Sequence, residues 1–474
     1  MTNDQQTPST EPTAAEERVR SVVEQGMPST IADLATLVRI PSVSWSAFDP
    51  KHVAASATAV AGLLEATGAF DSVAIRQAPI ADGGELGQPA VLATRAAKNG
   101  RPTVLLYAHH DVQPQGDDAN WDTPPFEPTV RGDRLYGRGA ADDKAGVMAH
   151  VASVRALVDG LGEDFDLGLA VFIEGEEEFG SRSFANFLKQ NKEALAADVI
   201  IVADSDNVDT ETPALTVSLR GNVTFRLTVS TLAHASHSGM YGGAAPDAML
   251  AMVRLLATLH DENGSVAVDG LTERDDATEP PALSEEQFRE EAALLDGVTP
   301  IGTGPILARM WSKPTITVTG IDAPSVANAS NTLLPSVAVR ISARIAPGQR
   351  ATDAYAALER HLRANAPFGA HIAIDDVDTG DPFLVDTTGW AATEAKRAMT
   401  DAWGKQAVET GIGGSIPFIA DLVREFPEAQ ILVTGVEDPD TRAHSPNESL
   451  HLGVFKRAIL AEALLLARLD ARSE

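Results

Sequence analysis

Residues that commonly bind divalent metals recur at the ends of successive predicted strands, each directly before a turn. An open parallel α/β sheet presents ligand-binding residues at the carboxyl ends of its strands, so these side chains can converge on one spot. Imidazole and carboxylate ligands together suit one or two divalent ions of the zinc type. In chain order the residues are His109-His110-Asp111, Asp142-Asp143, Glu176-Glu177-Glu178, Asp204-Ser205-Asp206 and, far downstream, His444.

Each cluster also has a simpler interpretation. The histidines could belong to a polar turn, Asp142-Asp143 could cap the helix that follows, and Glu176–Glu178 could be a solvated run of charge. The recurrence of the same ligand types at one strand end after another favours a metal centre over these separate explanations.

The hydrophobic pattern before residue 220 alternates between strands and helices. Short apolar runs that end at the potential metal ligands indicate buried parallel strands. In the segments between them the apolar residues have helical spacing. This β-α-β-α-β order predicts a doubly wound, mostly parallel α/β sheet with helices on both faces. The strands are expected at Val104–Ala108, Leu167–Ile173 and Val199–Ala203, and the helices at Glu16–Val38 (broken around Met27-Pro28), Lys144–Val158 and Ser181–Leu195.

From Gly221 the pattern changes to β-α-β-β-α-β, which predicts a small antiparallel sheet backed by two helices. The elements are expected at Val223–Ser230, Asp247–His260, Thr315–Thr319, Val337–Ile345, Thr352–Asn365 and His371–Asp375. We therefore predict a catalytic domain (18–219 and 382–474) interrupted by an α+β, ferredoxin-like lid and dimerisation domain (220–381), after a flexible leader (1–17).

Composition narrows the possible partners and cofactors. At 474 residues the chain exceeds what one core usually supports, and its net charge of −30 argues against nucleic acid or anionic membrane as a partner. Without cysteine, any metal must be held by nitrogen and oxygen ligands. The polar leader has neither a basic start nor an apolar stretch, so we expect no secretory signal, no transmembrane helix and a cytoplasmic location.

Four motifs that contain these residues resemble those of the M20 metallopeptidases, especially the carnosinase-like dipeptidases. The similarity runs in order from about Val38 to Leu466 and includes the inserted lid. The motifs are Tyr107–Pro114 (YAHHDVQP), Gly137–Lys144 (GRGAADDK), Glu174–Ser181 (EGEEEFGS) and Ala443–Glu448 (AHSPNE).

The resemblance implies a role for each residue in a centre of two divalent ions, zinc first, with manganese or cobalt as alternatives. His109 and Asp204 bind one ion, Glu178 and His444 bind the other, and Asp142 bridges both. Asp206 remains an alternative to Asp204. Asp111 orients His109, and Glu177 is the general base for a water that lies between the two ions. A cis peptide is expected between Asp142 and Asp143.

The resemblance also implies substrate-binding residues outside the metal motifs. His237, in the Gly-rich segment Ser236–Gly243, donates a hydrogen bond to the oxyanion, either within its own chain or in the neighbouring subunit of a homodimer. Arg344 grips the substrate carboxylate, with Arg340 as a rival on the same strand face. Gly414 and Ser415 line the substrate pocket.

These roles predict a dinuclear metallo-dipeptidase that hydrolyses the peptide bond of dipeptides. The long insertion Asp261–Trp311 is similar to that of carnosinase-type dipeptidases, which favours this activity. An N-acyl-amino-acid amidohydrolase of the same family is the alternative, because it would use the same metal residues with a different acyl pocket. A two-metal phosphoesterase is disfavoured, since the motifs offer few cations for phosphoryl oxygens. A non-catalytic homologue would lack part of this set.

Overall fold

A computed structural model describes residues 12–81, 83–162, 165–274, 283–413 and 417–472. The chain divides into two compact units. Unit 1 comprises Met1–Thr216, Val385–Glu409 and Asp421–Glu474, and unit 2 comprises Val217–Leu384 and Thr410–Ala420.

The segment Thr410–Ala420 groups with unit 2, whereas the sequence prediction includes it in the carboxyl-terminal part of the catalytic domain. The first helix also starts earlier than the predicted leader allows. Thr13 and Glu16 form a capping box, in which each side chain accepts a hydrogen bond from the other residue's backbone N–H, at 3.2 Å and 2.6 Å. This box satisfies two free N–H groups and starts α1 at Ala14.

Four parallel strands form the centre of the sheet in unit 1, in the order β6, β3, β7 and β17. Their side chains are almost all apolar and buried, as expected for strands covered on both faces. β1 and β2 add antiparallel strands beside β6, and β8 pairs antiparallel with β17. The predicted α/β fold with a mostly parallel central sheet is therefore confirmed. The strands are β1 (Ser72–Arg76), β2 (Ala90–Arg95), β3 (Thr103–His109), β6 (Gly168–Glu174), β7 (Val199–Ala203), β8 (Ala214–Leu219) and β17 (Gln430–Thr434).

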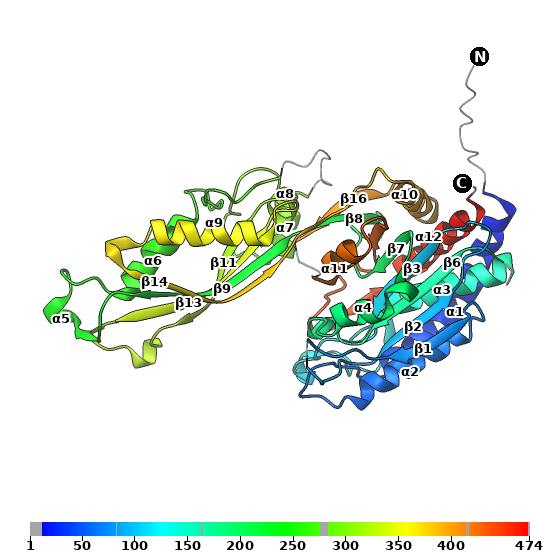
Figure 1. Ribbon diagram of the computed structural model, residues 1–474, viewed down its shortest axis with the longest axis horizontal. Helices are drawn as coiled ribbons and strands as arrows, with labels where there is room; N and C mark the ends of the chain where they lie inside the picture. The colour runs from blue at the N-terminus through cyan, green and yellow to red at the C-terminus, as the bar shows by residue number, and fades with distance from the viewer. Residues whose placement is uncertain (1–11, 82, 163–164, 275–282, 414–416, 473–474) are drawn as a thin grey trace, which may run out of the picture. The chain divides into compact units, whose positions relative to one another are not determined.

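Helices cover both faces of this sheet (Figure 1). α3 packs against β3 and β7 and also against α1 and α12, while α4 packs against β6, where Phe187 stacks on Phe172 with ring centroids 4.5 Å apart. Among the described helices, none combines the length and apolar character needed to cross a membrane. The helices of this unit are α1 (Ala14–Val38), α2 (Lys51–Glu65), α3 (Lys144–Leu161), α4 (Phe184–Leu195), α10 (Trp390–Trp403) and α12 (Leu452–Ala471), and α11 (Pro417–Glu425) ends in it.

The predicted break in the first helix at Met27-Pro28 is wrong, because α1 continues through Pro28. A proline inside a helix removes one hydrogen bond and costs about 3 kcal/mol. Buried side chains on both sides of Pro28, among them Val23, Met27 and Leu34, outweigh that cost by packing into the core.

Unit 2 contains the predicted β-α-β-β-α-β order. Its antiparallel sheet has the strand order β11, β13, β9 and β14, and α6 and α9 pack on one face. Every second residue of β9 and β13 points into the core beneath these helices, for example Phe225 and Ile341, which lie opposite each other. The elements are β9 (Gly221–Ser230), α6 (Ala248–Leu256), β11 (Thr315–Asp322), β13 (Ser336–Ile345), α9 (Ala351–Ala364) and β14 (His371–Gly380).

Shorter elements complete both units. In unit 1, β18 pairs with β5 and β5 with β4 in a small antiparallel sheet, and two of the sequence motifs lie next to it, one directly after β5 and one directly before β18. These elements are β4 (Thr129–Arg131), β5 (Arg134–Tyr136), β10 (Ser236–His237), α5 (Ser238–Tyr241), α7 (Glu285–Glu291), α8 (Ile306–Trp311), β12 (Thr332–Leu333), β15 (Phe383–Leu384), β16 (Val408–Ile412) and β18 (Ser449–His451).

A buried ion pair joins α3 to α12 and to β3. Nδ1 of His150 lies 2.9 and 3.0 Å from the carboxylate oxygens of Glu462, and Nε2 lies 2.9 Å from the Tyr107 carbonyl oxygen. Both nitrogens face acceptors, so both must carry a proton and the ring is a cation. Burial disfavours that charge, but Glu462 and the Tyr107 carbonyl outweigh it and raise the pKa of His150.

Replacing Glu462 with alanine should therefore destabilise the protein by about 3 kcal/mol, because it leaves the His150 cation buried without a counter-charge. Folding raises the pKa of His150, so the stabilisation is complete below the unfolded-state pKa of about 6.5 and is lost as pH rises through the folded-state value. Urea unfolding of the wild type and of Glu462→Ala, at about pH 6 and about pH 9, measures the loss of stability at each pH.

The control is Glu211→Ala. Glu211 is the exposed partner of Arg457, which lies on α12 like Glu462, and its loss should change the free energy of unfolding by less than about 0.5 kcal/mol. A Glu462→Ala effect that is equally small, or that grows towards alkaline pH, would contradict the ion pair.

Candidate metal centre

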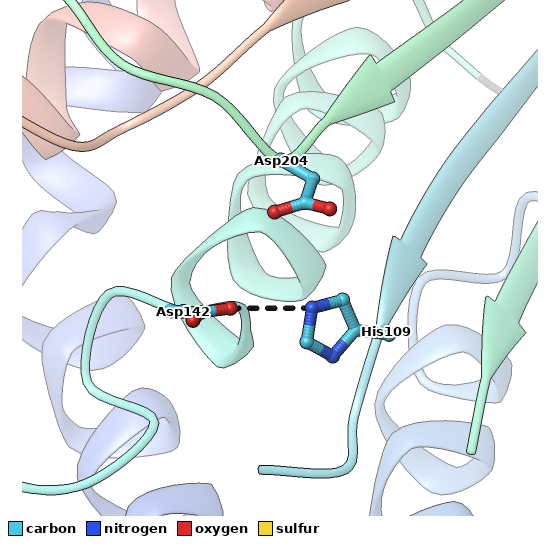
Figure 2. Close-up of side chains that lie close together, drawn as sticks. All are labelled: His109, Asp142 and Asp204. Atoms are coloured by element: carbon cyan, nitrogen blue, oxygen red, sulfur yellow. Dashed lines mark ion pairs between the residues drawn. The ribbon is translucent and has the colours of Figure 1, made fainter. Parts of the chain in front are cut away.

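Three side chains from three different elements meet above the central strands of unit 1 (Figure 2). His109 is the last residue of β3, Asp204 follows β7, and Asp142 precedes α3. Each offers one ligand atom, and these atoms all lie within 4.8 Å of one another. His109 Nε2 lies 3.2 Å from one carboxylate oxygen of Asp142. The parallel strands β3 and β7 bring His109 and Asp204 together because their carboxyl ends share one edge of the sheet, and the loop before α3 adds Asp142.

A second group of three lies beside the first and shares Asp142 with it. Its other members are Glu178, in the turn after β6, and His444, and their ligand atoms also lie within 4.8 Å of one another. His444 Nε2 lies 2.9 Å from the second carboxylate oxygen of Asp142 and 3.2 Å from Glu178. The two oxygens of Asp142 thus face two different histidines.

The donor set and its charge fit two divalent ions. Burial, together with neighbouring negative charge such as that of Asp142, raises the pKa of Glu178 to about 7 and that of Asp204 to about 6. Hydrogen bonds to Asp142 and Glu178 raise the pKa of His444 to about 10. The negative surroundings that stabilise a proton on His444 would also stabilise a metal cation. Nitrogen and oxygen donors suit zinc, manganese or cobalt.

Asp111 organises the site from behind the ligands. Its carboxylate lies 3.4 Å from His109 Nδ1, and its backbone carbonyl oxygen lies 3.2 Å from the same atom. A proton on Nδ1 leaves Nε2, the nitrogen that faces Asp142, free to bind a cation. The Asp111 carboxylate also accepts hydrogen bonds from the Ser44 hydroxyl at 2.7 Å and from the backbone N–H groups of Glu177 and Glu178 at 3.1 and 3.2 Å.

Glu177 belongs to neither group of three, yet it lies next to both. Burial, augmented by the charges of Asp204 and Glu178, raises its pKa well above the usual range of a carboxyl group, although His109 opposes the shift. Glu178 is held differently, because the backbone N–H and the side-chain amide of Gln113 donate to its two carboxylate oxygens at 3.0 and 2.7 Å. Glu178 is thus held within one group of potential ligand atoms, whereas Glu177 lies beside both groups.

Two residues that the sequence suggests as metal-binding candidates, Asp206 and His110, belong to neither ligand group. Asp206 forms a backbone bridge to Glu437 and belongs to neither group, whereas Asp204 does. His110 directs Nε2 to the carbonyl oxygen of Pro89 at 2.9 Å, and burial lowers its pKa to about 4. His110 is therefore a neutral, structural histidine. The peptide bond between Asp142 and Asp143 is cis.

Residues without an assigned role in the sequence analysis also shape the site. The Asp143 carboxylate accepts the His109 backbone N–H at 3.1 Å, and Glu448 accepts that of Asp142 at 3.1 Å. Asp143 and Glu448 both lie inside the four M20-like motifs. The Asp143 contact joins residues 34 positions apart and the Glu448 contact joins residues 306 positions apart, and a motif reveals neither. Ser44 lies outside every motif, so the sequence contained no signal for it.

Unit 2 holds the remaining predicted residues. His237 ends β10 and is exposed, and its Nδ1 accepts the Gly239 backbone N–H at 3.0 Å. Arg344 lies on β13 and is half-buried. Arg340 lies four residues earlier on the same face of β13, is exposed and contacts Asp376. Arg220 lies near Arg344, since burial and the charge of Arg344 lower its pKa to about 10. Gly414 and Ser415 lie outside the described residues.

Comparison with known proteins identifies the family. The model of peptidase family M20/M25/M40 matches residues 105–468. A cysteinylglycine-S-conjugate dipeptidase from Corynebacterium striatum is 36% identical over 372 residues, which cover 77% of this chain and 80% of that protein.

Two solved structures share the fold. The dipeptidase Dug1p from Saccharomyces cerevisiae has a TM-score of 0.75 at 22% identity, and human carnosine dipeptidase 1 has a TM-score of 0.75 at 23% identity. Each alignment covers 98% of this chain and 100% of the other. The matched span contains every residue of the two ligand groups, and this chain belongs to peptidase family M20/M25/M40 as a hydrolase of that family.

Proposed function

We propose that the chain hydrolyses the peptide bond of dipeptides at a centre of two divalent ions in unit 1. The observation that carries this proposal is the position of Asp142, whose two carboxylate oxygens each face a different histidine within a separate ligand group. His109 and Asp204 would hold one ion, Glu178 and His444 the other, and Asp142 both. Zinc is the ion we expect, with manganese or cobalt as alternatives.

The bound ions would polarise the scissile carbonyl and increase the acidity of the attacking water. Glu177 then accepts a proton from this water on its carboxylate and delivers it to the nitrogen of the leaving amine. Its position beside the ligands, with its backbone N–H held by Asp111, supports this role. Asp111 also keeps His109 in the tautomer that leaves Nε2 unprotonated.

Unit 2 would act as a lid that supplies groups for the substrate. Because Nδ1 of His237 accepts a hydrogen bond, its proton resides on Nε2, and this exposed N–H can donate to the oxyanion of the transition state. We propose that it does so in the neighbouring subunit of a homodimer. Arg344 would bind the substrate's terminal carboxylate through paired hydrogen bonds, with nearby Arg220 adding positive charge, and Gly414 and Ser415 would line the pocket.

The names of two relatives support the proposed substrate class. The Corynebacterium protein is named for cleavage of cysteinylglycine S-conjugates, and the human structure is that of carnosine dipeptidase 1. Both names describe dipeptides, which supports a dipeptide rather than an N-acyl amino acid as the substrate of this chain.

A substrate panel tests this function. Purified protein loaded with zinc should release amino acids from unblocked dipeptides and leave N-acetyl amino acids largely intact. Removal of the ions by a chelator should abolish hydrolysis, and added zinc should restore it. In the proposed mechanism the ions polarise the scissile carbonyl and increase the acidity of the attacking water. Faster turnover of N-acetyl amino acids would instead identify an N-acyl-amino-acid amidohydrolase, and chelator-resistant activity would contradict the metal mechanism.

Subunit mixing tests Glu177 and His237 together. Glu177→Gln should lower kcat at least about 100-fold and His237→Ala by a similar factor, because each removes one chemical role. Elemental analysis of Glu177→Gln should still find its ions, since Glu177 belongs to neither ligand group. Random reassociation of the two variants should recover about a quarter of wild-type activity, because half of the dimers then contain one complete site.

His234→Ala is the matched control, since His234 is an exposed histidine three residues before His237, and it should retain wild-type activity. Failure of the mixture to recover activity would mean that His237 acts within its own chain. Normal turnover of Glu177→Gln would remove Glu177 as the base.

A further inference from the structure

Glu448 is a fully buried carboxylate with four hydrogen-bond donors around it. One oxygen accepts from the backbone N–H groups of Ala141 and Asp142, at 3.0 and 3.1 Å. The other accepts from the Arg138 guanidinium at 2.6 Å and from the Gly139 backbone N–H at 3.1 Å. Buried Arg138 compensates the negative charge, so the arrangement is stable without direct contact with a metal ion.

These contacts join two segments that are far apart in the chain. Asp142 ends the segment that Glu448 grips, and His444 lies only four residues before Glu448. Further hydrogen bonds link the same segments, from Gly137 N–H to the Glu448 carbonyl oxygen at 3.0 Å and from Arg138 to the Ser445 carbonyl oxygen at 3.4 Å. β5 and β18 continue the pairing on the other side of Gly137.

We propose that Glu448 is a positioning residue that sets the distance between Asp142 and His444, and so prepares the ion site formed by Asp142, Glu178 and His444. This inference rests on the two-ion centre of the proposed function. Asp142 sits in a loop and His444 is more than half exposed, so without this link the two ligands would have to be ordered by the ion itself. Ordering them in advance lowers the entropic cost of binding.

Glu448→Gln tests the proposal. The amide keeps one acceptor oxygen, and its NH2 group, which can only donate, then faces the two donors that the other carboxylate oxygen accepted from. Protein stripped by a chelator is titrated with zinc in a calorimeter. The wild type should bind two ions. Glu448→Gln should bind the ion that His109 and Asp204 also hold with a smaller loss of affinity, and the ion at Glu178 and His444 about 10- to 100-fold more weakly, as measured for other residues that support metal ligands.

Asp438→Asn is a matched control for a purely structural effect. Asp438 is also a buried carboxylate, and it pairs with Arg134 of β5 through both oxygens at 2.9 and 2.8 Å, but neither contacts Asp142. It should lower the unfolding midpoint as Glu448→Gln does, yet keep both zinc affinities. Equal loss of the second ion in both variants, or normal zinc binding by Glu448→Gln, would overturn the proposal.

If Glu448→Gln does not fold, Glu448→Asp decides, since it keeps the charge but reaches one methylene less far. It should weaken the second ion about 10-fold, and unchanged zinc binding would contradict the positioning role. A wild-type protein that binds fewer than two ions would refute the two-ion centre itself. Two ions without dipeptide hydrolysis would refute only the proposed substrate.

Discussion

One buried carboxylate, that of Asp142, holds the site together. Its two oxygens face His109 and His444 at 3.2 and 2.9 Å, so two ligand groups can exist side by side only if this side chain keeps its orientation. Burial alone would raise the pKa of Asp142, but hydrogen bonds from the two histidines hold it below its usual range. Much of the surrounding structure, including Asp111, Asp143 and Glu448, holds these residues or their backbone in place.

The parallel sheet makes this arrangement possible. β3, β6 and β7 end at the same edge, where His109 is the last residue of β3, Asp204 directly follows β7, and Glu178 lies four residues after the end of β6. The strands themselves are apolar and buried on both faces, which fixes their ends and concentrates negative charge where cations can compensate it. The protein thus places several of its buried carboxylates beside the ends of buried strands, an arrangement that can order a metal site before an ion binds.

Much of this could be predicted from the sequence, because apolar runs that end in ligand-type residues define both the strands and their carboxyl ends. The alternation before residue 220 and the β-α-β-β-α-β order after it were recognisable for the same reason. The continuous helix through Pro28 was not, because tertiary packing outweighs a local penalty that the sequence shows in isolation. The contacts of Ser44 and Glu448 were also beyond prediction, since they depend on how distant segments meet. Site roles in unit 2 came from resemblance alone.

A crystal structure of the zinc-loaded protein, with anomalous scattering at the zinc edge, would test directly whether Asp142 bridges two ions. We predict two zinc peaks about 3.5 to 4 Å apart, one on each side of the Asp142 carboxylate, with His109 on one ion and His444 on the other. A single peak, or two peaks that do not share Asp142, would contradict it.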